Sequence, residues 1–274
     1  MRYIITTKDV KKPIKDFLLE NTISRKALKA IKQHGKILVN GKHQTVRYLL
    51  HEKDCIEIEF PIESSGIIPN AMDLDIYFED DDFLVINKPS NLPCIPTKRY
   101  PTHTLANAIM YYYQQRDIKA TVHLVNRLDK DTRGLLLVAK SRHMHSLLSK
   151  DIKQVERIYQ CVVEGRLQGS GVIETGITKD VDSVKRLIDE SGKLSITKYQ
   201  VLSNSDNTSL VECQLLTGRT HQIRVHMAYL GHPLVGDTLY GASTSQTYYL
   251  DSISLSFIHP VTKKRITIKK SNTR

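Results

Sequence analysis

The run NRLDKDTRGLLL occupies residues 126–137 and joins a charged segment to an apolar one. From Gly134 onward the run is apolar, which is typical of a buried strand. Arg127 and Asp129 stand just before this strand. Folding alone gives no reason to keep an ionised carboxylate there unless the carboxylate is paired or used. The run therefore directs the search for chemistry to Asp129.

Two interpretations of this segment remain open. If residues 126–129 are extended, Arg127 and Asp129 point to one side while Leu128 packs into the core, because side chains alternate along a strand. A carboxylate beside a guanidinium stays ionised at neutral pH and keeps a fixed orientation. The pair is then either an ion pair that braces a loop or part of a catalytic site.

Length and composition indicate the broad class of protein. The chain has 274 residues, 40% of them hydrophobic, which is enough for one sizeable core and a small accessory domain. No stretch approaches the roughly 18 apolar residues of a membrane span, and the first residues are too polar for a signal peptide. We therefore expect a cytoplasmic protein without a membrane partner, and a monomer by default. The four cysteines are far apart, so we expect buried, reduced thiols and neither a disulfide framework nor a zinc site.

The basic charge gathers at the two ends of the chain. The net charge is +11, residues 1–60 hold 13 Lys and Arg against 7 Asp and Glu, and residues 263–274 hold six basic and no acidic residues. Such asymmetry favours a polyanionic partner, of which nucleic acid is the commonest. A basic surface that is merely solvated is the alternative.

The N-terminal charge lies on a predicted helix. Ser24 and Gly35 bracket a helical pattern as N-cap and terminator. Residues 37–39, the turn Asn40-Gly41 and residues 43–47 predict a hairpin, and residues 54–60 predict a third strand. The basic side chains of this unit that we expect to bind RNA are Arg25, Lys26, Lys29, Lys32 and Lys42. An ordinary basic helix on a solvated face is the alternative.

This unit resembles a known RNA-binding domain. The run SRKALK at 24–29, followed by GKILVNGK at 35–42, resembles the small domain named after the fourth small-subunit ribosomal protein, over roughly residues 12–60. The resemblance implies that the basic helix and hairpin contact structured RNA. Residues 61–72 mix Pro, Ser and Gly without a period and predict a linker. The predicted organisation is an RNA-binding domain over 1–60, a linker over 61–72 and a second domain over 73–274.

The second domain mixes strand and helix patterns. Strands are expected at 74–78, 83–87, 134–139, 157–163 and 208–215. Helices are expected at 104–116, with Leu105, Ala108, Ile109 and Tyr112 on the buried face, and at 141–150 and 220–230. Regular βαβ repetition is missing, which predicts an α+β fold. No Gly-rich phosphate loop follows a strand, so we expect no nucleotide cofactor.

Two further segments carry candidate functional residues. Residues 155–165 predict a strand with Arg157, Tyr159 and Cys161 on one side. A helix from Thr220 places His221, Arg224 and Ala228 on one face, so that Arg224 faces a partner across a cleft. His221 and His226 are five residues apart and have no adjacent Cys or Glu, so we expect no metal site.

Together these segments closely resemble the RluA/RluD-type pseudouridine synthase family over roughly residues 73–268. The matching elements occur in family order and are residues 74–76 through Asn87-Lys88-Pro89, then 127–134, Arg157-x-Tyr159, Gly192-Lys193 with Thr197, and 217–241. The resemblance implies a catalytic domain built on a mixed, mostly antiparallel sheet with flanking helices. It implies an enzyme that isomerises uridine to pseudouridine in RNA without a cofactor. Ribosomal RNA is the first expectation for the substrate, and transfer RNA is the family's other substrate class.

The resemblance also implies a role for individual residues. It makes Asp129 the catalytic aspartate, Tyr159 the aromatic residue that packs against the target base, and Arg224 the ion-pair partner of the aspartate. Arg127 matches the arginine that helps to hold RNA after the target base has flipped out. Ile223 is expected to line the pocket.

The chain departs from the family pattern at three places. The family usually has His before Arg-Leu-Asp and Ser before the glycine, where this chain has Asn126 and Arg133. Arg133 adds a charge that can meet a phosphate, so we include it among the RNA-binding residues. After Lys88-Pro89 the chain reads SNLP at residues 90–93, where a glycine is common. Since the three catalytic positions are intact, we expect an active enzyme.

The chemistry leaves two routes open. Asp129 either attacks the anomeric carbon of the ribose as a nucleophile or removes the neighbouring ribose proton to give a glycal. Tyr159 is a candidate for the later removal of the proton on carbon 5. The alternative function is a noncatalytic RNA-binding or ribosome-assembly factor on the same scaffold. A nuclease is disfavoured, because no carboxylate cluster or His pair with the spacing of a metal site or of general acid-base catalysis appears.

Overall fold

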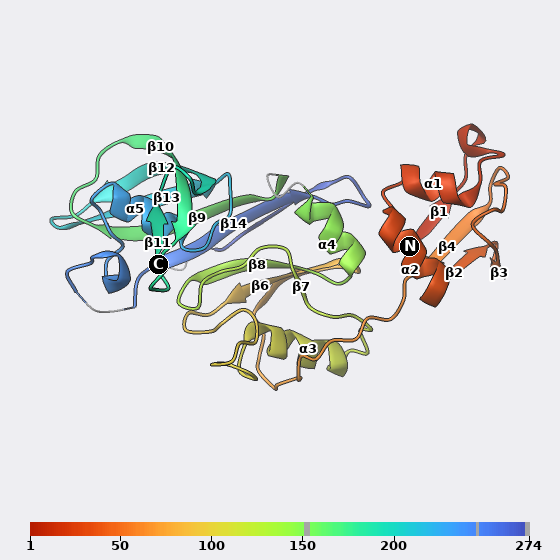
Figure 1. Cartoon of the computed structure of the whole chain (residues 1–274), viewed down its shortest axis with the longest axis horizontal. Coiled ribbons are helices and arrows are strands. Elements are labelled where there is room, and N and C mark those ends of the chain that lie inside the picture. The colour runs from red at the N-terminus through yellow and green to blue at the C-terminus, as the bar shows by residue number, and fades with distance from the viewer. Residues whose placement is uncertain (151–153, 245–246, 272–274) are drawn as a thin grey trace. The chain divides into compact units, whose positions relative to one another are not determined.

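The computed structural model describes residues 1–150, 154–244 and 247–271, and the chain divides into two compact units. Residues 1–66 and 118–121 form the first unit, and residues 67–117 and 122–274 form the second (Figure 1). Of the basic C-terminal run, Arg274 lies outside the described residues. None of the described helices is long and apolar enough to cross a membrane.

The first unit is a small sheet with two helices and a short 3-10 turn (Figure 1). Its strands pair in the order β1 (Arg2–Ile4), β4 (Cys55–Glu59), β2 (Lys36–Val39) and β3 (Lys42–His43). Its helical segments are η1 (Thr7–Asp9), α1 (Ile14–Glu20) and α2 (Arg25–His34). Apolar side chains of the helices and strands, among them Phe17, Ile31 and Ile56, form a separate core. The predicted helix and third strand are confirmed. The second strand of the hairpin was expected at 43–47 but is β3 at Lys42–His43, and β1 and α1 were not predicted.

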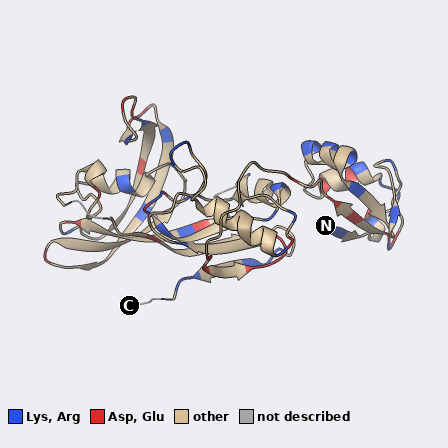
Figure 2. Ribbon diagram, turned by 90° about the horizontal axis from the view of Figure 1, so that it is seen from below, with Lys and Arg blue, Asp and Glu red and all other residues tan. Residues whose placement is uncertain are grey.

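Helix α2 begins and ends where the sequence predicts. The hydroxyl of Ser24 accepts a hydrogen bond from Ala27 N at 3.1 Å, and the helix stops at Gly35. In the following turn, Asn40 and Gly41 have φ values of 51° and 76°, as a tight hairpin turn requires. All five basic residues predicted to bind RNA are exposed. Figure 2 shows Lys and Arg along the helical side of this unit.

The second unit is built on one large sheet. In the described part of the chain its strands follow the order β11 (Arg186–Ile188), β10 (Ser170–Lys179), β12 (Lys193–Asn204), β13 (Thr208–Leu215), β9 (Glu156–Glu164), β14 (Leu250–Ile258), β8 (Arg133–Ala139), β6 (Phe83–Lys88) and β5 (Ile76–Glu79). Off this path, β15 (Arg265–Lys269) pairs with β14, and β7 (His123–Leu124) pairs with β8. Among these described strands only β8 and β14 pair in parallel. The prediction of an α+β fold with a mixed, mostly antiparallel sheet is confirmed.

Helices cover the part of the sheet that contains β8. These are α3 (Leu105–Gln115) and α4 (Arg142–Ser149), which lie on opposite sides of β6 and β8 in Figure 1. Residues 135–139 are completely buried, because both faces of the strand are covered. The apolar run of residues 134–139 is therefore a central strand. In α3 the buried ring is Tyr113, so the expectation for Tyr112 was wrong by one position.

The segment before β8 has no strand structure. Residues 126–129 lie between β7 and β8, yet Arg127 is exposed and Leu128 is buried, in the alternation expected of an extended chain. Asp129 therefore stands on an irregular loop, a few residues ahead of the buried strand β8. The remaining helical segments are α5 (Gln222–Tyr229) and the short 3-10 helix η3 (Thr238–Tyr240).

Gly134 makes the parallel contact between β8 and β14 possible. Its φ is 107°, and a side chain at this position would overlap the backbone of Ser252 and the carboxylate of Asp251. We expect Gly134→Ala to lower the free energy of unfolding by about 3 kcal/mol, as the combined cost of backbone strain and overpacking. Urea denaturation measures this change.

Gly241 offers a matched control for that variant. Its φ is 100°, but a side chain there would meet nothing within 4 Å. Gly241→Ala should therefore cost only the backbone strain, about 1 kcal/mol. An equal cost for both variants would show that the close approach of β14 at Gly134 does not limit stability.

Candidate active site

A pocket in the second unit collects the residues that the sequence singles out. Five predicted site residues line it, namely Arg127, Asp129, Tyr159, Ile223 and Arg224. They come from the loop before β8, from β9 and from α5. The pocket also includes Arg219 and His221, which were not predicted to act there. Segments that are distant in the sequence thus meet at one place.

Strand β9 supplies Tyr159 as predicted. Side chains alternate along this strand, and Arg157, Tyr159 and Cys161 are all buried on one side. The guanidinium of Arg157 donates to the carbonyl of Val155 at 3.1 Å and to that of Leu215 at 3.3 Å. Arg157 thereby holds the end of β13, from which the chain continues toward α5.

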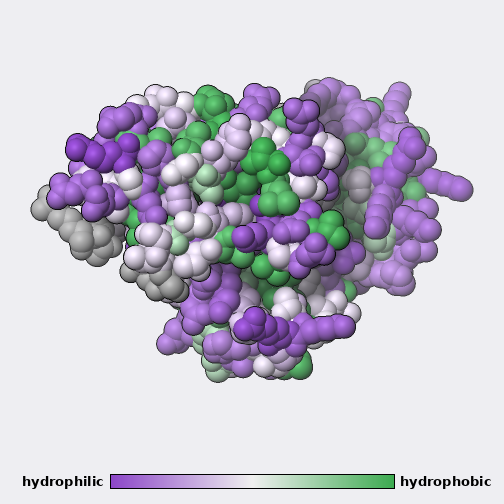
Figure 3. Space-filling model, turned by 60° about the vertical axis from the view of Figure 1, so that its left-hand side comes forward, coloured by the Kyte–Doolittle hydropathy of each residue, from purple (hydrophilic) through white to green (hydrophobic). Residues whose placement is uncertain are grey.

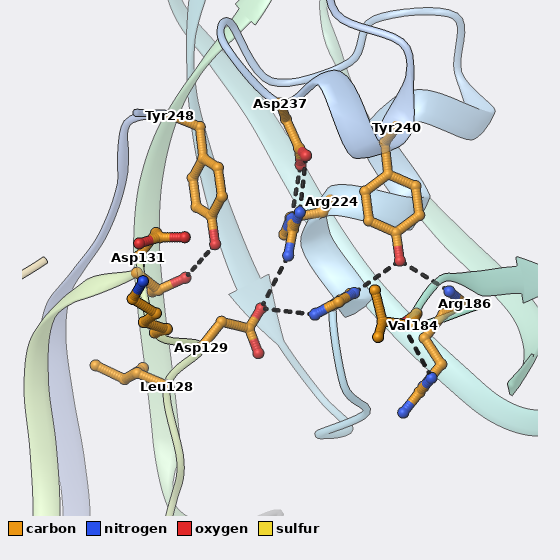
Figure 4. A network of polar contacts seen from close by, with 12 residues as sticks. Leu128, Asp129, Asp131, Val184, Arg186, Arg224, Asp237, Tyr240 and Tyr248 are labelled. Carbon is orange, nitrogen blue, oxygen red and sulfur yellow. Dashed lines mark hydrogen bonds and ion pairs between the residues drawn. The ribbon is translucent and has the colours of Figure 1, made fainter. Parts of the chain in front are cut away.

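Arg224 lies against Asp129 but is held mainly by another residue. Its Nη1 is 3.8 Å from Oδ2 of Asp129, while Nε and Nη2 donate to the two carboxylate oxygens of Asp237 at 2.6 and 2.7 Å (Figure 4). The guanidinium also lies against the rings of Tyr240 and Tyr248, 5.0 and 4.6 Å from their centroids. Such bidentate pairing fixes the guanidinium in one orientation. The contacts with Asp237 and the two tyrosine rings therefore hold the guanidinium of Arg224 with Nη1 toward Asp129.

The two charged partners respond differently to burial. Burial raises the pKa of Asp129, and the lowering effects of Arg224 and Lys88 do not cancel it. Burial by itself lowers the pKa of Arg224, but its hydrogen bonds with Asp237 raise that pKa above the ordinary value. Arg224 therefore stays charged, whereas burial opposes the ionisation of Asp129.

A buried lysine holds the loop that carries Asp129. Lys88 is fully buried, and its Nζ donates to the carbonyls of Pro89, Leu92 and Lys130 at 2.8, 2.8 and 2.9 Å. Burial lowers the pKa of Lys88 to about 8. Because Lys130 directly follows Asp129, this one ammonium ties the end of β6 to the loop that carries Asp129.

The departure after Lys88-Pro89 has a conformational explanation. Asn91 has a φ of 60°, the left-handed region that glycine favours and asparagine tolerates. The neighbouring Ser90 hydroxyl donates to the carbonyl of Asp131 at 2.7 Å. The segment thus keeps a glycine-like turn and adds a further contact to the loop of Asp129.

Helix α5 begins two residues later than predicted. His221 has a left-handed φ of 58°, so it lies before the helix and not on one of its faces. The amide of Gln222 secures this start by accepting from Thr217 Oγ1 and Arg219 N, both at 2.9 Å. It also donates to Ile196 O and Thr197 Oγ1, both at 3.0 Å. The backbone conformation of His221 turns its imidazole into the pocket.

The three histidines of this segment have separate partners. The ring nitrogens of His226 lie 2.9 and 3.2 Å from the hydroxyls of Thr197 and Thr175, and burial lowers its pKa to about 4. His232 Nδ1 is 2.7 Å from the carbonyl of Glu164. Across the described ranges no group of three His, Cys, Asp or Glu is placed to hold a metal ion.

Asn126, which replaces the usual histidine, faces Tyr159. Its Oδ1 accepts from Leu137 N at 2.8 Å, which fixes the amide, and its Nδ2 has no hydrogen-bond partner within the described part of the chain. Burial raises the pKa of Tyr159, against the lowering effects of Arg157, the Ser252 hydroxyl and the Asn126 amide. Asn126 therefore lies close enough to Tyr159 to affect its pKa, although no hydrogen bond joins the two side chains among the described contacts.

Arg133, the other departure, is held by an ion pair. Its Nε lies 3.0 Å from Oδ2 of buried Asp251, and its guanidinium stacks 4.6 Å from the centroid of Tyr249. The Arg133 side chain is still 46% exposed. Arg133 therefore has a structural partner, and contact with a phosphate remains a prediction.

The turn between β10 and β11 exposes apolar residues, Val181 and Val184. Figure 3 shows apolar side chains at the surface of the side that carries β10 and α5. Arg186, two residues after Val184, donates its backbone N–H to Tyr240 Oη at 2.9 Å.

Sequence reasoning missed several residues of this site. Asp237 and Tyr240 lie in the run GDTLYG at 236–241, where an aspartate among apolar residues was the available signal. Lys88 was noticed only as part of a motif. Tyr248 follows no recognisable pattern, since its contact with Arg224 arises from the path of the chain into β14.

Comparison with known proteins identifies the class. The model of the family described as RNA pseudouridylate synthase matches residues 82–229, more than half of the chain. Together with the pocket and sheet described above, this match defines an RNA-modifying isomerase. The chain belongs to the RNA pseudouridylate synthase family.

Individual relatives agree with this family. The chain is 43% identical over 262 residues to "Uncharacterized RNA pseudouridine synthase YjbO" of Bacillus subtilis (strain 168), covering 92% of this chain and 93% of that protein. It is 33% identical to "Ribosomal large subunit pseudouridine synthase D" of Zymomonas mobilis, covering 89% of this chain and 84% of that protein. The fold resembles that of "Human RNA Pseudouridylate Synthase Domain Containing 4", with a TM-score of 0.60 at 23% identity, covering 73% of this chain and 88% of that one.

Proposed function

We propose that this enzyme isomerises uridines of large-subunit ribosomal RNA and that Asp129 is the carboxylate that acts on the ribose. The observation that carries the role of Asp129 is its placement in a pocket between Arg224 and Tyr159. The substrate rests on a relative that is named a ribosomal large subunit pseudouridine synthase. Transfer RNA is the other candidate substrate.

The pocket suits a uridine that has left its stack. Extruding a base costs about a few kcal/mol, which the enzyme must offset with contacts to the flipped nucleotide. Leu128, Ile223 and Leu250 give the pocket an apolar lining that can retain the detached uracil. Arg127 is exposed at the pocket, where its charge can hold the RNA backbone.

Both routes for Asp129 conserve atoms and electrons. In the nucleophilic route an oxygen of Asp129 bonds to the anomeric carbon as the bond to uracil nitrogen 1 breaks. In the glycal route the carboxylate removes the proton of ribose carbon 2 as the same bond breaks. In the nucleophilic route carbon 5 of the rotated uracil then displaces the Asp129 oxygen from the anomeric carbon. In the glycal route carbon 5 bonds to the anomeric carbon while ribose carbon 2 takes its proton back from Asp129. In both routes carbon 5 finally loses its proton and nitrogen 1 gains one. The reaction is an isomerisation, so it needs no oxidant or reductant.

Tyr159 is proposed to take the carbon 5 proton by a relay. Burial raises the pKa of Tyr159, so its hydroxyl stays protonated at neutral pH. It can accept the new proton only by giving up its own. The Asp129 carboxylate is a suitable acceptor, because it interacts electrostatically with Tyr159 and because burial raises its pKa too.

We further propose that the first unit binds structured RNA, like the ribosomal-protein domain it resembles. Its support is the exposed basic face of α2 with Arg25, Lys26, Lys29 and Lys32. Changing all four to Gln should reduce the log-log dependence of RNA affinity on salt by about 3, from roughly 0.7 for each neutralised phosphate contact. Filter binding at several salt concentrations measures this slope.

A charge-matched control separates the helix from net charge. Lys193, Lys198, Lys263 and Lys264 are exposed residues of the second unit, and changing them to Gln removes the same charge. The proposal expects a smaller change of slope for this control. It fails if the α2 variant leaves the slope unchanged, or if both variants change it equally.

The substrate is tested with RNA labelled with tritium at uracil carbon 5. Transcripts of large-subunit ribosomal RNA and of transfer RNA are incubated separately with the purified chain. We expect tritium release from the ribosomal transcript. Release from transfer RNA alone would contradict the proposed substrate, and release from neither would contradict the proposed activity on these RNAs.

A further inference from the structure

His221 occupies a position in the pocket that the mechanism above does not use. Its side chain is only 14% exposed, and its Nε2 lies 4.0 Å from Oδ2 of Asp129. On the other side of the ring, Nδ1 is 2.8 Å from Tyr240 Oη. The imidazole thus contacts the carboxylate of Asp129 with one ring nitrogen and the hydroxyl of Tyr240 with the other. The ring therefore connects the catalytic loop to η3.

The contacts of Tyr240 determine which nitrogen of His221 carries the proton. The oxygen of Tyr240 accepts from the backbone N–H of Arg186 at 2.9 Å. Its own proton can then be donated to Nδ1 of His221. In that arrangement the ring proton lies on Nε2, the nitrogen that faces Asp129 and the one that the inference below requires to be protonated.

The imidazole is neutral at physiological pH. Burial lowers the pKa of His221 to about 4, assisted by Arg224 and Arg186 and opposed by Asp237. These groups, together with Asp129 and Tyr240, face the ring from α5, β11, η3 and the loop before β8. His221 is thus a neutral donor and not the cationic half of an ion pair.

Two groups converge on one oxygen of Asp129. Arg224 Nη1 and His221 Nε2 lie 3.8 and 4.0 Å from the same Oδ2. Both dashed lines in Figure 4 end on this oxygen, and the other carboxylate oxygen points away from them. Catalytic contacts in a free enzyme are often longer than in the complex with substrate, so a distance of 4.0 Å can shorten when RNA is bound.

We infer that His221 is a positioning residue which, together with Arg224, holds Oδ2 of Asp129 through a neutral Nε2–H and leaves Oδ1 to act on the ribose. This inference rests on the proposed catalytic role of Asp129. It adds a second anchor to the carboxylate and distinguishes its two oxygens.

One short segment supports both anchors. Asp237 binds Arg224 through two hydrogen bonds, and the ring of Tyr240 lies 5.0 Å from the guanidinium of Arg224. The hydroxyl of the same tyrosine contacts His221. Residues 237–240 therefore set the positions of both groups on Oδ2. This arrangement gives a physical reason for an Asp and a Tyr three residues apart.

His221→Asn and His221→Gln test the inference. Asparagine tolerates the left-handed backbone but is too short to reach Asp129, whereas glutamine carries an amide donor near the place of Nε2. We expect His221→Asn to lower the single-turnover rate on saturating tritiated ribosomal transcript by about 10- to 100-fold, as for a lost hydrogen bond to a charge. RNA affinity should change less than about twofold. His221→Gln should recover part of this rate, at least about a third of the loss on a logarithmic scale.

The pH profile separates positioning from a general structural role. A hydrogen bond to the carboxylate lowers the pKa of Asp129, so its loss should move the acid limb of the rate profile upward by about half a pH unit or more. If His221→Asn slows the reaction without moving this limb, or if it has no effect on the rate, the inference is overturned. Melting temperatures confirm that each variant is folded.

Tyr240→Phe is the second variant if His221→Asn does not fold. It keeps the ring against Arg224 and removes the hydroxyl that fixes the tautomer of His221. We expect a loss of about three- to tenfold. An unchanged rate for Tyr240→Phe in that case overturns the inference. Asp129→Asn separates the two proposals. An active Asp129→Asn variant would contradict the proposed catalytic role of Asp129, whereas a normal rate of His221→Asn would contradict only the positioning role of His221.

Discussion

Asp129→Asn should abolish tritium release from the ribosomal transcript, with a loss in the single-turnover rate of about four orders of magnitude or more. The amide is nearly the same shape as the carboxylate but can neither attack the anomeric carbon nor take a ribose proton. RNA affinity should stay within about twofold, since Arg127 and the basic α2 are untouched. Filter binding measures the affinity on the same transcript.

The same variant should be at least as stable as the parent enzyme. Burial raises the pKa of Asp129, so the folded state binds its proton more tightly than the unfolded chain does. The stability that this proton contributes is present at low pH and is lost as the pH rises through the folded-state pKa. Asparagine avoids the cost of the buried charge at neutral pH, so the melting temperature of Asp129→Asn should equal or exceed that of the parent.

The parent enzyme should lose activity as the pH falls through this raised pKa, because the protonated carboxyl is inactive. The acid limb of its rate profile should lie above the ordinary range of an aspartate. Residual activity of Asp129→Asn within about tenfold of the parent would contradict the catalytic role. A marked loss of stability would show that Asp129 braces the loop instead.

Tyr159→Phe should reduce the rate by about 100-fold or more, the usual contribution of a general acid or base. Phenylalanine keeps the aromatic wall of the pocket and removes only the hydroxyl that is proposed to relay the carbon 5 proton. The single-turnover rate of tritium release measures this step directly, because the tritium leaves from carbon 5.

Tyr248→Phe is a matched control for the loss of a hydroxyl. Tyr248 packs against Arg224, and its hydroxyl lies 3.5 Å from that of Thr132. Its hydroxyl has no proposed part in the reaction, so we expect a change of less than about threefold. If Tyr159→Phe is as active as Tyr248→Phe, then Tyr159 only packs against the base.

Elements with a local signal could be predicted from the sequence. Helix α2 follows from its Ser24 cap, its apolar period and Gly35, and β9 follows from the alternation around Tyr159. In both cases neighbouring residues determine the structure. The strands β10, β12 and β14 were not predicted, although β14 alternates polar and apolar residues. The pairing of these strands depends on partner strands elsewhere in the chain, so a local sequence pattern does not predict it.

The site could be predicted at the level of its main residues but not of their connections. Asp129, Tyr159 and Arg224 were expected together, and they line one pocket. The hydrogen bonds between Asp237 and Arg224, and the contact of Tyr240 with His221, connect the segment of η3 to the start of α5. The left-handed conformation of His221 also decides where its ring points. These features depend on tertiary geometry, so sequence spacing misplaced His221 on the helix.

The most direct test of the account is a map of pseudouridine in ribosomal RNA from cells that lack this chain. The cells are complemented with the parent chain or with Asp129→Asn at equal expression. We predict that defined uridines of large-subunit ribosomal RNA lose their pseudouridine and regain it only with the parent chain. Restoration of the modification by Asp129→Asn would contradict the account. A noncatalytic assembly factor instead predicts an unchanged map together with a growth or assembly defect that Asp129→Asn repairs.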